Sequence, residues 1–177
     1  QASGAGGLQV HTAPDSIESE AFRTLRTTIA FSATESECLA ISSSEPSDGK
    51  TTVLSNLGVA AAHTGARTLL IDADMRRPGM SKLFEVRGEK GLGNILRGTE
   101  SVAEMATAFE QPTGVEHMTM IPAGIRPVDP TGMLSGPRFS ELLEWARGKY
   151  DQVFIDTPPI LAASDATIIG RLVDGLM

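Results

Sequence analysis

Short apolar runs alternate with amphipathic segments along most of the chain. Four runs have the length of strands and cover residues 38–42, 67–72, 118–121 and 152–156. Such runs are typical of strands that are buried on both faces of a parallel sheet. The segments between them carry apolar residues at three- and four-residue intervals, as helices do that pack on a sheet. No Asn-Gly turn joins two runs, so the pattern predicts an α/β fold, with a parallel β-sheet and helices on both faces.

The two ends of the chain differ in pattern. Residues 1–14 are small, Gly-rich and without a period, so we expect a flexible linker or arm there and a single domain over residues 15–177. Asp15 and Glu18 have the spacing of a capping box and predict a helix over about residues 16–33. Residues 174–177 read as the start of another strand, so we expect a C-terminally truncated domain.

The remaining connections are rich in glycine and proline, which interrupt helices and strands. They predict a C-cap at Gly65, short helical pieces within residues 80–110, a loop over residues 122–137, a helix around residues 139–146 and a last helix that Asp165 caps and that runs through Arg171.

Composition removes several classes of function. The chain has 177 residues and a net charge of −7, which argues against a nucleic-acid partner because such binding needs a clustered basic surface. No apolar stretch is long enough to span a membrane.

The single cysteine, Cys38, cannot form an intrachain disulfide, and this fits a reduced, cytoplasmic setting. The histidines show no ligand spacing with Cys38, so we expect no zinc site.

The segment 42–52 (SSSEPSDGKTT) has the composition of a phosphate-binding loop and lies between a predicted strand and a predicted helix. Small residues let backbone N–H groups face an anion, the helix N-terminus adds partial positive charge, and a lysine reaches the β- and γ-phosphates. Ser44 stands where G-x-x-x-x-G-K-[ST] has its first glycine. We expect ATP to be bound by Ser47, Asp48, Gly49, Lys50, Thr51 and Thr52.

Acidic residues end two of the predicted strands. Asp72 and Asp74 follow one strand and Asp156 ends another, so a parallel sheet would bring all three to the side of Lys50. Three carboxylates beside a triphosphate require a cation, and Mg²⁺ prefers such oxygen ligands. Arg76 and Arg77 come next and could reach phosphates or an acceptor, although paired basic residues in a turn are commonly just exposed to solvent.

These motifs together resemble a known family. Residues 44–51, LLIDADMRRP (69–78), VFIDTPP (153–159) and the IPAG segment with its Pro-rich loop (121–137) look like the bacterial protein-tyrosine kinases of capsule and exopolysaccharide synthesis, over residues 15–177. The resemblance implies a P-loop NTPase fold. It also implies these roles: Lys50 steadies the phosphates, Thr51 and Asp74 contact the metal directly or through water, Asp156 holds the metal, and Asp72 orients or deprotonates the attacking tyrosine hydroxyl.

A second family feature lies in the first predicted helix. Glu20, Arg23 and Arg26 match the E-x-x-R-x-x-R motif through which these kinases form rings. Spacing alone would favour a solvated face with a weak i,i+3 pair. The resemblance implies instead an octamer-like homo-oligomer that phosphorylates itself in trans. It further implies a membrane adaptor with a chain-length-determinant domain and a tyrosine phosphatase as partners, at the inner face of the plasma membrane.

Two other functions remain open at this point. A ParA/MinD-type switch ATPase shares the loop and the acidic strands, but Glu45 occupies the place of its signature lysine. A nucleotide-binding regulator of polysaccharide chain length would need no tyrosine transfer. The chain contains no tyrosine cluster, and its only tyrosine, Tyr150, is predicted to serve packing.

Overall fold

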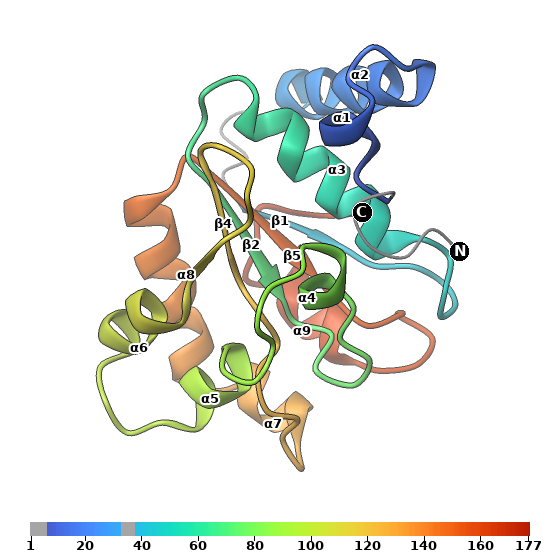
Figure 1. The fold of residues 1–177 in the computed structure, drawn as a ribbon. Helices are drawn as coiled ribbons and strands as arrows, with labels where there is room; N and C mark the ends of the chain where they lie inside the picture. The colour runs from blue at the N-terminus through green and yellow to red at the C-terminus, as the bar shows by residue number, and fades with distance from the viewer. Residues whose placement is uncertain (1–6, 33–37) are drawn as a thin grey trace.

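The four apolar runs form the interior of one sheet. The computed structural model describes residues 7–32 and 38–177, and Figure 1 shows the sheet between two groups of helices. The central strands all pair in parallel, in the spatial order β4-β2-β5-β1. They are β1 (Cys38–Ile41), β2 (Thr68–Asp72), β4 (Met118–Ile121) and β5 (Gln152–Asp156). Almost every residue of these strands is buried, as their continuous apolar character predicts.

Two short strands complete the edges of the sheet. β6 (Gly175–Leu176) pairs in parallel with β1, which confirms the strand expected at residues 174–177. β3 (Gln111–Pro112) pairs with β4 in the antiparallel sense, so the prediction of a wholly parallel sheet is wrong at this edge. A two-residue strand that contains proline has no apolar run of its own, and proline is tolerated only at a sheet edge.

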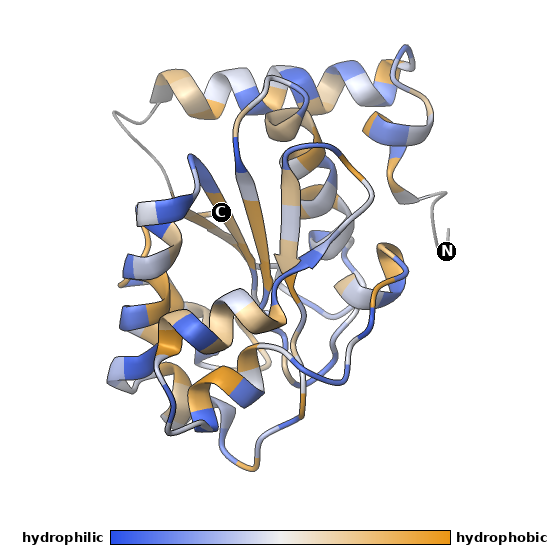
Figure 2. Cartoon of the chain, turned by 60° about the vertical axis from the view of Figure 1, so that its left-hand side comes forward, coloured by the Kyte–Doolittle hydropathy of each residue, from blue (hydrophilic) through white to orange (hydrophobic). Residues whose placement is uncertain are grey.

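Helices cover both faces of the sheet. One face carries α1 (Gln9–Thr12), α2 (Ile17–Ser32), α3 (Lys50–Ala62) and α4 (Met80–Leu83). The other carries α5 (Leu92–Arg97), α6 (Val102–Phe109), α7 (Pro130–Leu134), α8 (Pro137–Lys149) and α9 (Asp165–Gly170). Figure 2 shows apolar strands at the centre and helices of mixed character around them. Most of the helices therefore bury an apolar side in the interior, against the sheet or against a neighbouring helix.

Helix α3 is buried on almost every side after its first turn. Residues 54–62 are all buried, because the sheet lies beneath the helix and α2 packs across it. Phe22, Leu25 and Ile29, whose spacing predicts the inner face of α2, pack against the same apolar cluster. The first turn of α3 is thus presented by a helix that is held firmly from both sides.

The N-terminal segment differs from the prediction of a flexible arm. Residues 7–14 include α1, and Leu8 and Val10 are only 4% and 1% exposed. The side-chain amide of Asn56 on α3 donates to the carbonyl of Gly7 and accepts the N–H of Val10. Two apolar residues among glycines were too weak a pattern to predict this docking. Residues 1–6 and 33–37 lie outside the described residues.

Several helix boundaries also differ from the predictions. Helix α3 ends at the C-cap His63 rather than at Gly65. The cap of α2 is Ser16 rather than Asp15, because the Ser16 hydroxyl accepts the N–H of Ser19 at 3.1 Å. The predicted loop 122–137 contains α7, which Asp129 caps by accepting the N–H of Gly132 at 2.9 Å. Asp165 is the first residue of α9 rather than its cap, which is Ser164.

Candidate functional site

The predicted phosphate loop joins the end of β1 to the start of α3. Gly49 is the N-cap of α3 and has a left-handed backbone (φ 91°), a conformation that suits glycine. Ser47 is also left-handed (φ 74°), and Asp48 accepts the N–H of Glu45 at 2.8 Å. Residues 44–48 are exposed. The loop therefore leads into the free N–H groups of a helix N-terminus, which attract anions.

The ends of β2 and β5 bring the predicted acidic residues to Lys50. The ammonium of Lys50 lies 3.0 Å from Asp74 Oδ2 and 3.3 Å from Asp156 Oδ1. The hydroxyl of Thr51 donates to Asp156 Oδ2 at 2.5 Å. Asp74 and Asp156 are almost completely buried, and the Lys50 side chain is 10% exposed. The structure thus brings together the four residues to which the sequence assigned phosphate and metal contacts.

Asp72 organises the loop that follows β2. Its Oδ1 accepts the N–H of Asp74 and its Oδ2 accepts the N–H of Met80, both at 3.2 Å. The residue is fully buried, so an acceptor hydroxyl has no direct path to it in this arrangement. The N–H of Arg77 in turn donates to Asp74 Oδ1 at 2.9 Å. Asp72 and Asp74 therefore fix the two ends of one turn.

Burial and like charges shift the proton affinity of this cluster. Burial, assisted by the charge of Asp156, raises the pKa of Asp72 to about 8. Burial also raises the pKa of Asp156, although the Lys50 charge opposes it. Burial alone would lower the pKa of Lys50, but attraction to Asp156 and Asp74 outweighs it and the net shift is upward. The site holds more negative charge than one ammonium can balance.

The Oδ1 of Asp156 lies 3.3 Å from the Lys50 ammonium but is not saturated by hydrogen bonds, so a cation could also engage it. This oxygen is buried and accepts no hydrogen bond from the described residues. Within the same residues, no three His, Cys, Asp or Glu side chains converge closely enough to hold a metal by themselves. Mg²⁺ needs only one or two carboxylates, because substrate phosphates and water supply its other ligands. Asp156, Asp74 and the Thr51 hydroxyl are therefore a suitable partial ligand set.

A strap between two loops was not predicted from the sequence. The N–H of Thr157 donates to the carbonyl of Ile41, the hydroxyl of Ser42 donates to Pro158 O at 3.0 Å, and Ile160 N–H donates to Ser43 O at 2.9 Å. These bonds tie the start of the phosphate loop to the segment that follows Asp156. The two adjacent prolines, which leave carbonyls but no N–H groups, were the only signal in the sequence.

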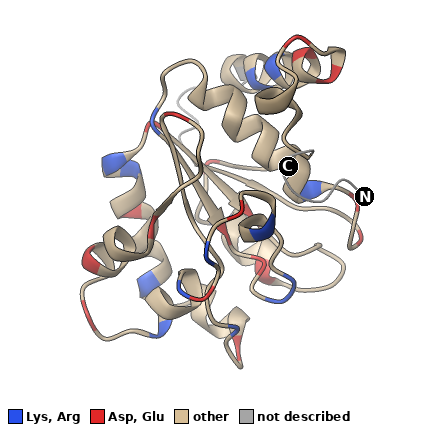
Figure 3. Cartoon of the chain, in the orientation of Figure 1, with Lys and Arg blue, Asp and Glu red and all other residues tan. Residues whose placement is uncertain are grey.

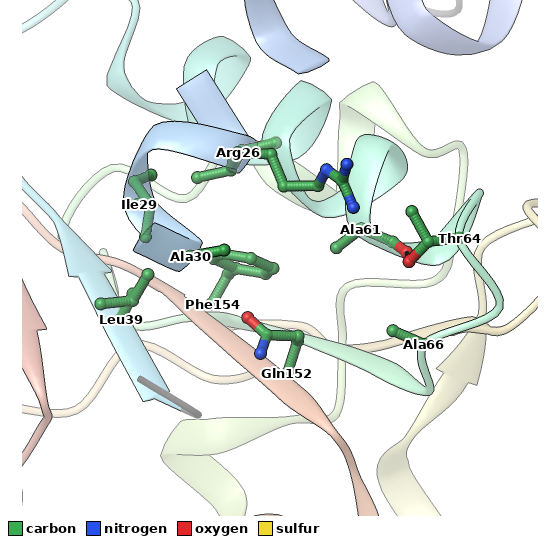
Figure 4. Close-up of a pocket in the computed structure, with 10 residues that line it drawn as sticks. Arg26, Ile29, Ala30, Leu39, Ala61, Thr64, Ala66, Gln152 and Phe154 are labelled. Carbon is green, nitrogen blue, oxygen red and sulfur yellow. Dashed lines mark hydrogen bonds between the residues drawn. The ribbon is translucent and has the colours of Figure 1, made fainter. Parts of the chain in front are cut away.

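The predicted ring residues lie on α2, away from the phosphate loop. Arg23 is 3.6 Å from Glu20 and donates through Nη1 to the carbonyl of Pro14 at 2.9 Å. Arg26 lines a cavity of about 250 Å³ beside β1 and β5, where apolar residues such as Phe154 form the wall (Figure 4). Its Nε is buried and has no hydrogen-bond partner among the described residues. Glu20 and Arg23, two of the three motif residues, therefore already contact groups of the same chain.

Tyr150 serves packing, as the sequence predicts. It is 7% exposed, its hydroxyl donates to Glu110 Oε2 at 2.5 Å, and the hydroxyl of Thr119 donates to it.

Figure 3 shows basic and acidic segments interspersed over the helices and loops.

Comparison with known proteins places these features in context. A family model described as an AAA domain matches residues 36–170. The tyrosine-protein kinase wzc of Salmonella typhimurium is 40% identical over 160 residues, which are 89% of this chain and 22% of that protein. The tyrosine-protein kinase YwqD of Bacillus subtilis is 37% identical over 166 residues, which are 93% of this chain and 68% of that protein.

Solved structures give the same picture. The kinase domain of the Escherichia coli tyrosine kinase ETK has a TM-score of 0.88 and 37% identity, and the match covers 96% of this chain and 66% of that one. The septum site-determining protein MinD of Pyrococcus horikoshii, complexed with Mg-ADP, is more distant, with a TM-score of 0.62 and 25% identity over 79% of this chain and 56% of that one. The fold is therefore that of a P-loop NTPase.

Proposed function

The chain belongs to the family of bacterial tyrosine-protein kinases, and from that premise we propose that it transfers the γ-phosphoryl group of ATP to tyrosine hydroxyls. The chain spans about a fifth of the length of the Salmonella relative, so the activity of a whole protein built on it is part of the same proposal. We infer from the resemblance of the motifs to the kinases of capsule and exopolysaccharide synthesis that the reaction serves this synthesis and export.

One observation carries the proposal. Lys50, in the first turn of α3, places its ammonium beside the carboxylates of both Asp74 and Asp156. Gly49 is the N-cap of the same helix, so the N-terminus of α3 lies next to this ammonium. A triphosphate would find backbone N–H groups, one ammonium and a cation-binding carboxylate pair in a single place. Phosphoryl transfer depends on such positioning and charge neutralisation more than on covalent chemistry.

The residues of the chain would divide the work as follows. The loop 44–49 and Lys50 would hold the phosphates, with Ser47, Asp48 and Thr52 at the rim of the site. Asp156, Asp74 and Thr51 would hold Mg²⁺, which when bound neutralises phosphate charge and orients the substrate. Lys50 now bridges two carboxylates, so its ammonium would turn toward the phosphates when a divalent ion takes its place beside them.

Asp72 would orient the acceptor tyrosine or accept its proton. A carboxylate can accept the phenol proton late in phosphoryl transfer, when the bond to phosphorus is already forming. Because Asp72 is fully buried, the turn over residues 73–79 would have to shift before a phenol reached it. Asp72→Asn should therefore lower the transfer rate strongly while ATP binding changes little.

The proposal is tested by incubating the protein with Mg-ATP and a tyrosine-rich peptide. Phosphotyrosine mass spectrometry should detect transfer to the peptide, and the Lys50→Met variant should abolish it. ADP formation without any phosphotyrosine would reject the kinase activity. That result would favour a switch ATPase of the MinD kind, with which the chain shares its fold. Nucleotide binding with neither product would favour the chain-length regulator.

Assembly is a separate part of the proposal. We propose that Glu20, Arg23 and Arg26 contribute to an octamer-like ring in which one copy phosphorylates the next, at the inner face of the plasma membrane beside a membrane adaptor, with a tyrosine phosphatase reversing the reaction. Among the described residues no helix has the length and apolar character to cross a membrane. Replacing all three residues by alanine should lower the molar mass in light scattering, and an unchanged mass would reject their role in assembly.

A further inference from the structure

A cluster of three side chains joins segments that are far apart in the sequence. Arg76 follows β2, Thr131 lies on α7 and Asp165 is the first residue of α9. Arg76 Nε donates to Asp165 Oδ2 at 2.9 Å, and Arg76 Nη2 lies 3.3 Å from Asp165 Oδ1. Thr131 Oγ1 accepts from the same Nη2 at 3.0 Å and donates to Asp165 Oδ1 at 2.5 Å. Both carboxylate oxygens of Asp165 thus have partners within the cluster.

The geometry of the cluster is that of a strong and specific interaction. Two nitrogens of Arg76 face two oxygens of Asp165, which is the bidentate arrangement that fixes a guanidinium in direction as well as in position. Asp165 is 1% exposed, whereas the Arg76 side chain is 36% exposed. A buried carboxylate is costly without a partner, and Arg76 and Thr131 supply partners for Asp165.

The backbone connects the cluster to the candidate site, because Arg76 and Asp74 belong to the same turn. Arg76 is two residues beyond Asp74, in the turn that Asp72 closes by accepting the N–H groups of Asp74 and Met80. Asp74 faces Lys50 on one side and accepts the N–H of Arg77 on the other. Arg76 therefore anchors the middle of the turn to α7 and α9, which lie on the face of the sheet opposite to α3.

We propose that Asp165 is a positioning residue: with Thr131 it holds Arg76, and through Arg76 it keeps Asp74 directed at Lys50 and the phosphate loop. This inference rests on the proposed function for its catalytic consequence. Positioning of this kind affects the transfer step more than binding, because small displacements of a reacting geometry cost large factors in rate. Phosphate affinity depends mainly on Lys50 and the N–H groups of α3, which the cluster does not touch.

The test compares two Arg–Asp pairs in the same chain. Asp165→Asn removes the buried charge and keeps the shape, and Thr131→Val removes the hydroxyl at constant size. The matched control is Asp151→Asn, because Asp151 pairs with Arg67 at the other ends of β2 and β5. Asp165→Asn should lower kcat about 10- to 100-fold and leave the dissociation constant for Mg-ATP within about twofold. Thr131→Val should show a smaller decrease of the same kind, and the control should show none.

Hydrogen exchange of the nucleotide-free protein supplies a readout that needs no activity. The amides of residues 74 and 77 should exchange faster in Asp165→Asn, while those of β1 and β5 and the thermal midpoint remain close to the wild type. Unchanged kcat and exchange would overturn the proposal, and so would a parallel loss of rate, affinity and thermal midpoint. If Asp165→Asn fails to fold, Arg76→Lys and Thr131→Val decide by the same measurements.

A double variant tests whether the residues act through one another. Arg76→Lys combined with Asp165→Asn should be no slower than the slower single variant, and additive losses would contradict the proposal. A wild-type protein that transfers no phosphate would reject the proposed function alone. In that case the rate of ADP formation, together with the exchange of residues 74 and 77, provides the comparison for Asp165.

Discussion

The two ends of strands β2 and β5 carry charged residues under opposite conditions. At the amino ends, Arg67 Nη2 and Asp151 Oδ1 lie 2.6 Å apart, and their side chains are 61% and 45% exposed. At the carboxyl ends, Asp72 and Asp156 are fully buried, and Lys50 is the ammonium that faces Asp156. The same sheet thus has a solvated ion pair at one end and a desolvated charge cluster at the other.

The difference in solvent exposure gives the two ends of β2 and β5 different properties. Water already stabilises both members of an exposed pair, so their contact adds little and nothing requires a ligand. In the buried cluster, loss of contact with solvent raises the pKa of Asp72 and of Asp156, and neighbouring carboxylates add to the rise. A buried cluster of this kind is costly until cations and phosphates complete it. The carboxyl ends are therefore organised for binding at the expense of stability.

The largest effect should come from removing the ammonium at the carboxyl ends. Lys50→Met should weaken Mg-ATP binding about 100-fold or more, because charge-assisted bonds to phosphate are lost. It should also lower the free energy of unfolding by about 3 kcal/mol, because Asp74 and Asp156 keep no cation. Isothermal titration calorimetry and urea unfolding measure the two effects. Lys82→Met, at an exposed position on α4, is the control, and unaltered ATP binding in Lys50→Met would contradict the site.

The next effect should separate stability from activity. Asp156→Asn removes a repulsive neighbour of Asp72 and should leave the nucleotide-free protein at least as stable as the wild type. The same change should lower phosphoryl transfer about 100-fold, because the cation loses a charged ligand. Urea unfolding without nucleotide and the transfer rate at saturating Mg-ATP give the two values. A less stable protein with a normal rate would reverse the assignment.

A smaller effect concerns Tyr150, which lies beside the exposed pair at the amino ends. Burial and the bond to Glu110 raise the pKa of its phenol above the ordinary value of about 10. The neutral phenol is the favoured form in the folded protein, so its contribution is complete below about pH 10 and is lost as the pH rises further. Because Tyr150 is the only tyrosine, near-ultraviolet absorbance reports its ionisation alone.

Phenolate should appear only together with unfolding, which the fluorescence of Trp145 follows independently. Tyr150→Phe should reduce the free energy of unfolding by about 1 kcal/mol, since Glu110 keeps Lys149 as a partner at 2.5 Å. A folded protein that ionises Tyr150 near pH 10 would show that the phenol is not held as described.

The smallest effect should come from the exposed pair itself. Asp151→Asn should change the thermal midpoint at neutral pH by no more than about 2 °C. Bonds from Arg67 lower the pKa of Asp151 to about 2, so the pair contributes at pH values above the ordinary range of aspartate. The difference between wild type and variant should vanish as the pH falls from about 4 toward 2. A large midpoint change at neutral pH would remove the contrast between the two ends.

The meeting of Lys50 with the acidic residues at the carboxyl ends could be predicted from sequence because it follows from simple rules. Strands β2 and β5 are apolar runs that end in aspartate, and parallel strands bring such ends together. Lys50 and Gly49 lie in a motif whose spacing is set by the phosphate itself. The local sequence pattern and the fixed geometry of parallel strands were therefore sufficient to predict which side chains lie together at the carboxyl ends.

The rest depends on contacts between distant residues. Nothing near Arg76 in the sequence indicates that its partner is Asp165, 89 positions away. The docking of Leu8 and Val10 depends on the amide of Asn56, and the helix α7 depends on the Asp129 cap inside a Pro-rich stretch. Sequence periodicity contains no information on such pairings, because they are decided only when the helices meet.

The side chain of Asn56 links the phosphate loop to the beginning of the described chain. Its amide nitrogen donates to two carbonyls, that of Gly7 and that of Thr52 in the first turn of α3. A protease that cuts between residues 7 and 13 must first release this shared contact. The rate of that cleavage is therefore a gauge of how firmly the start of α3 is held, and nucleotides that tighten this turn should protect the N-terminal segment from digestion.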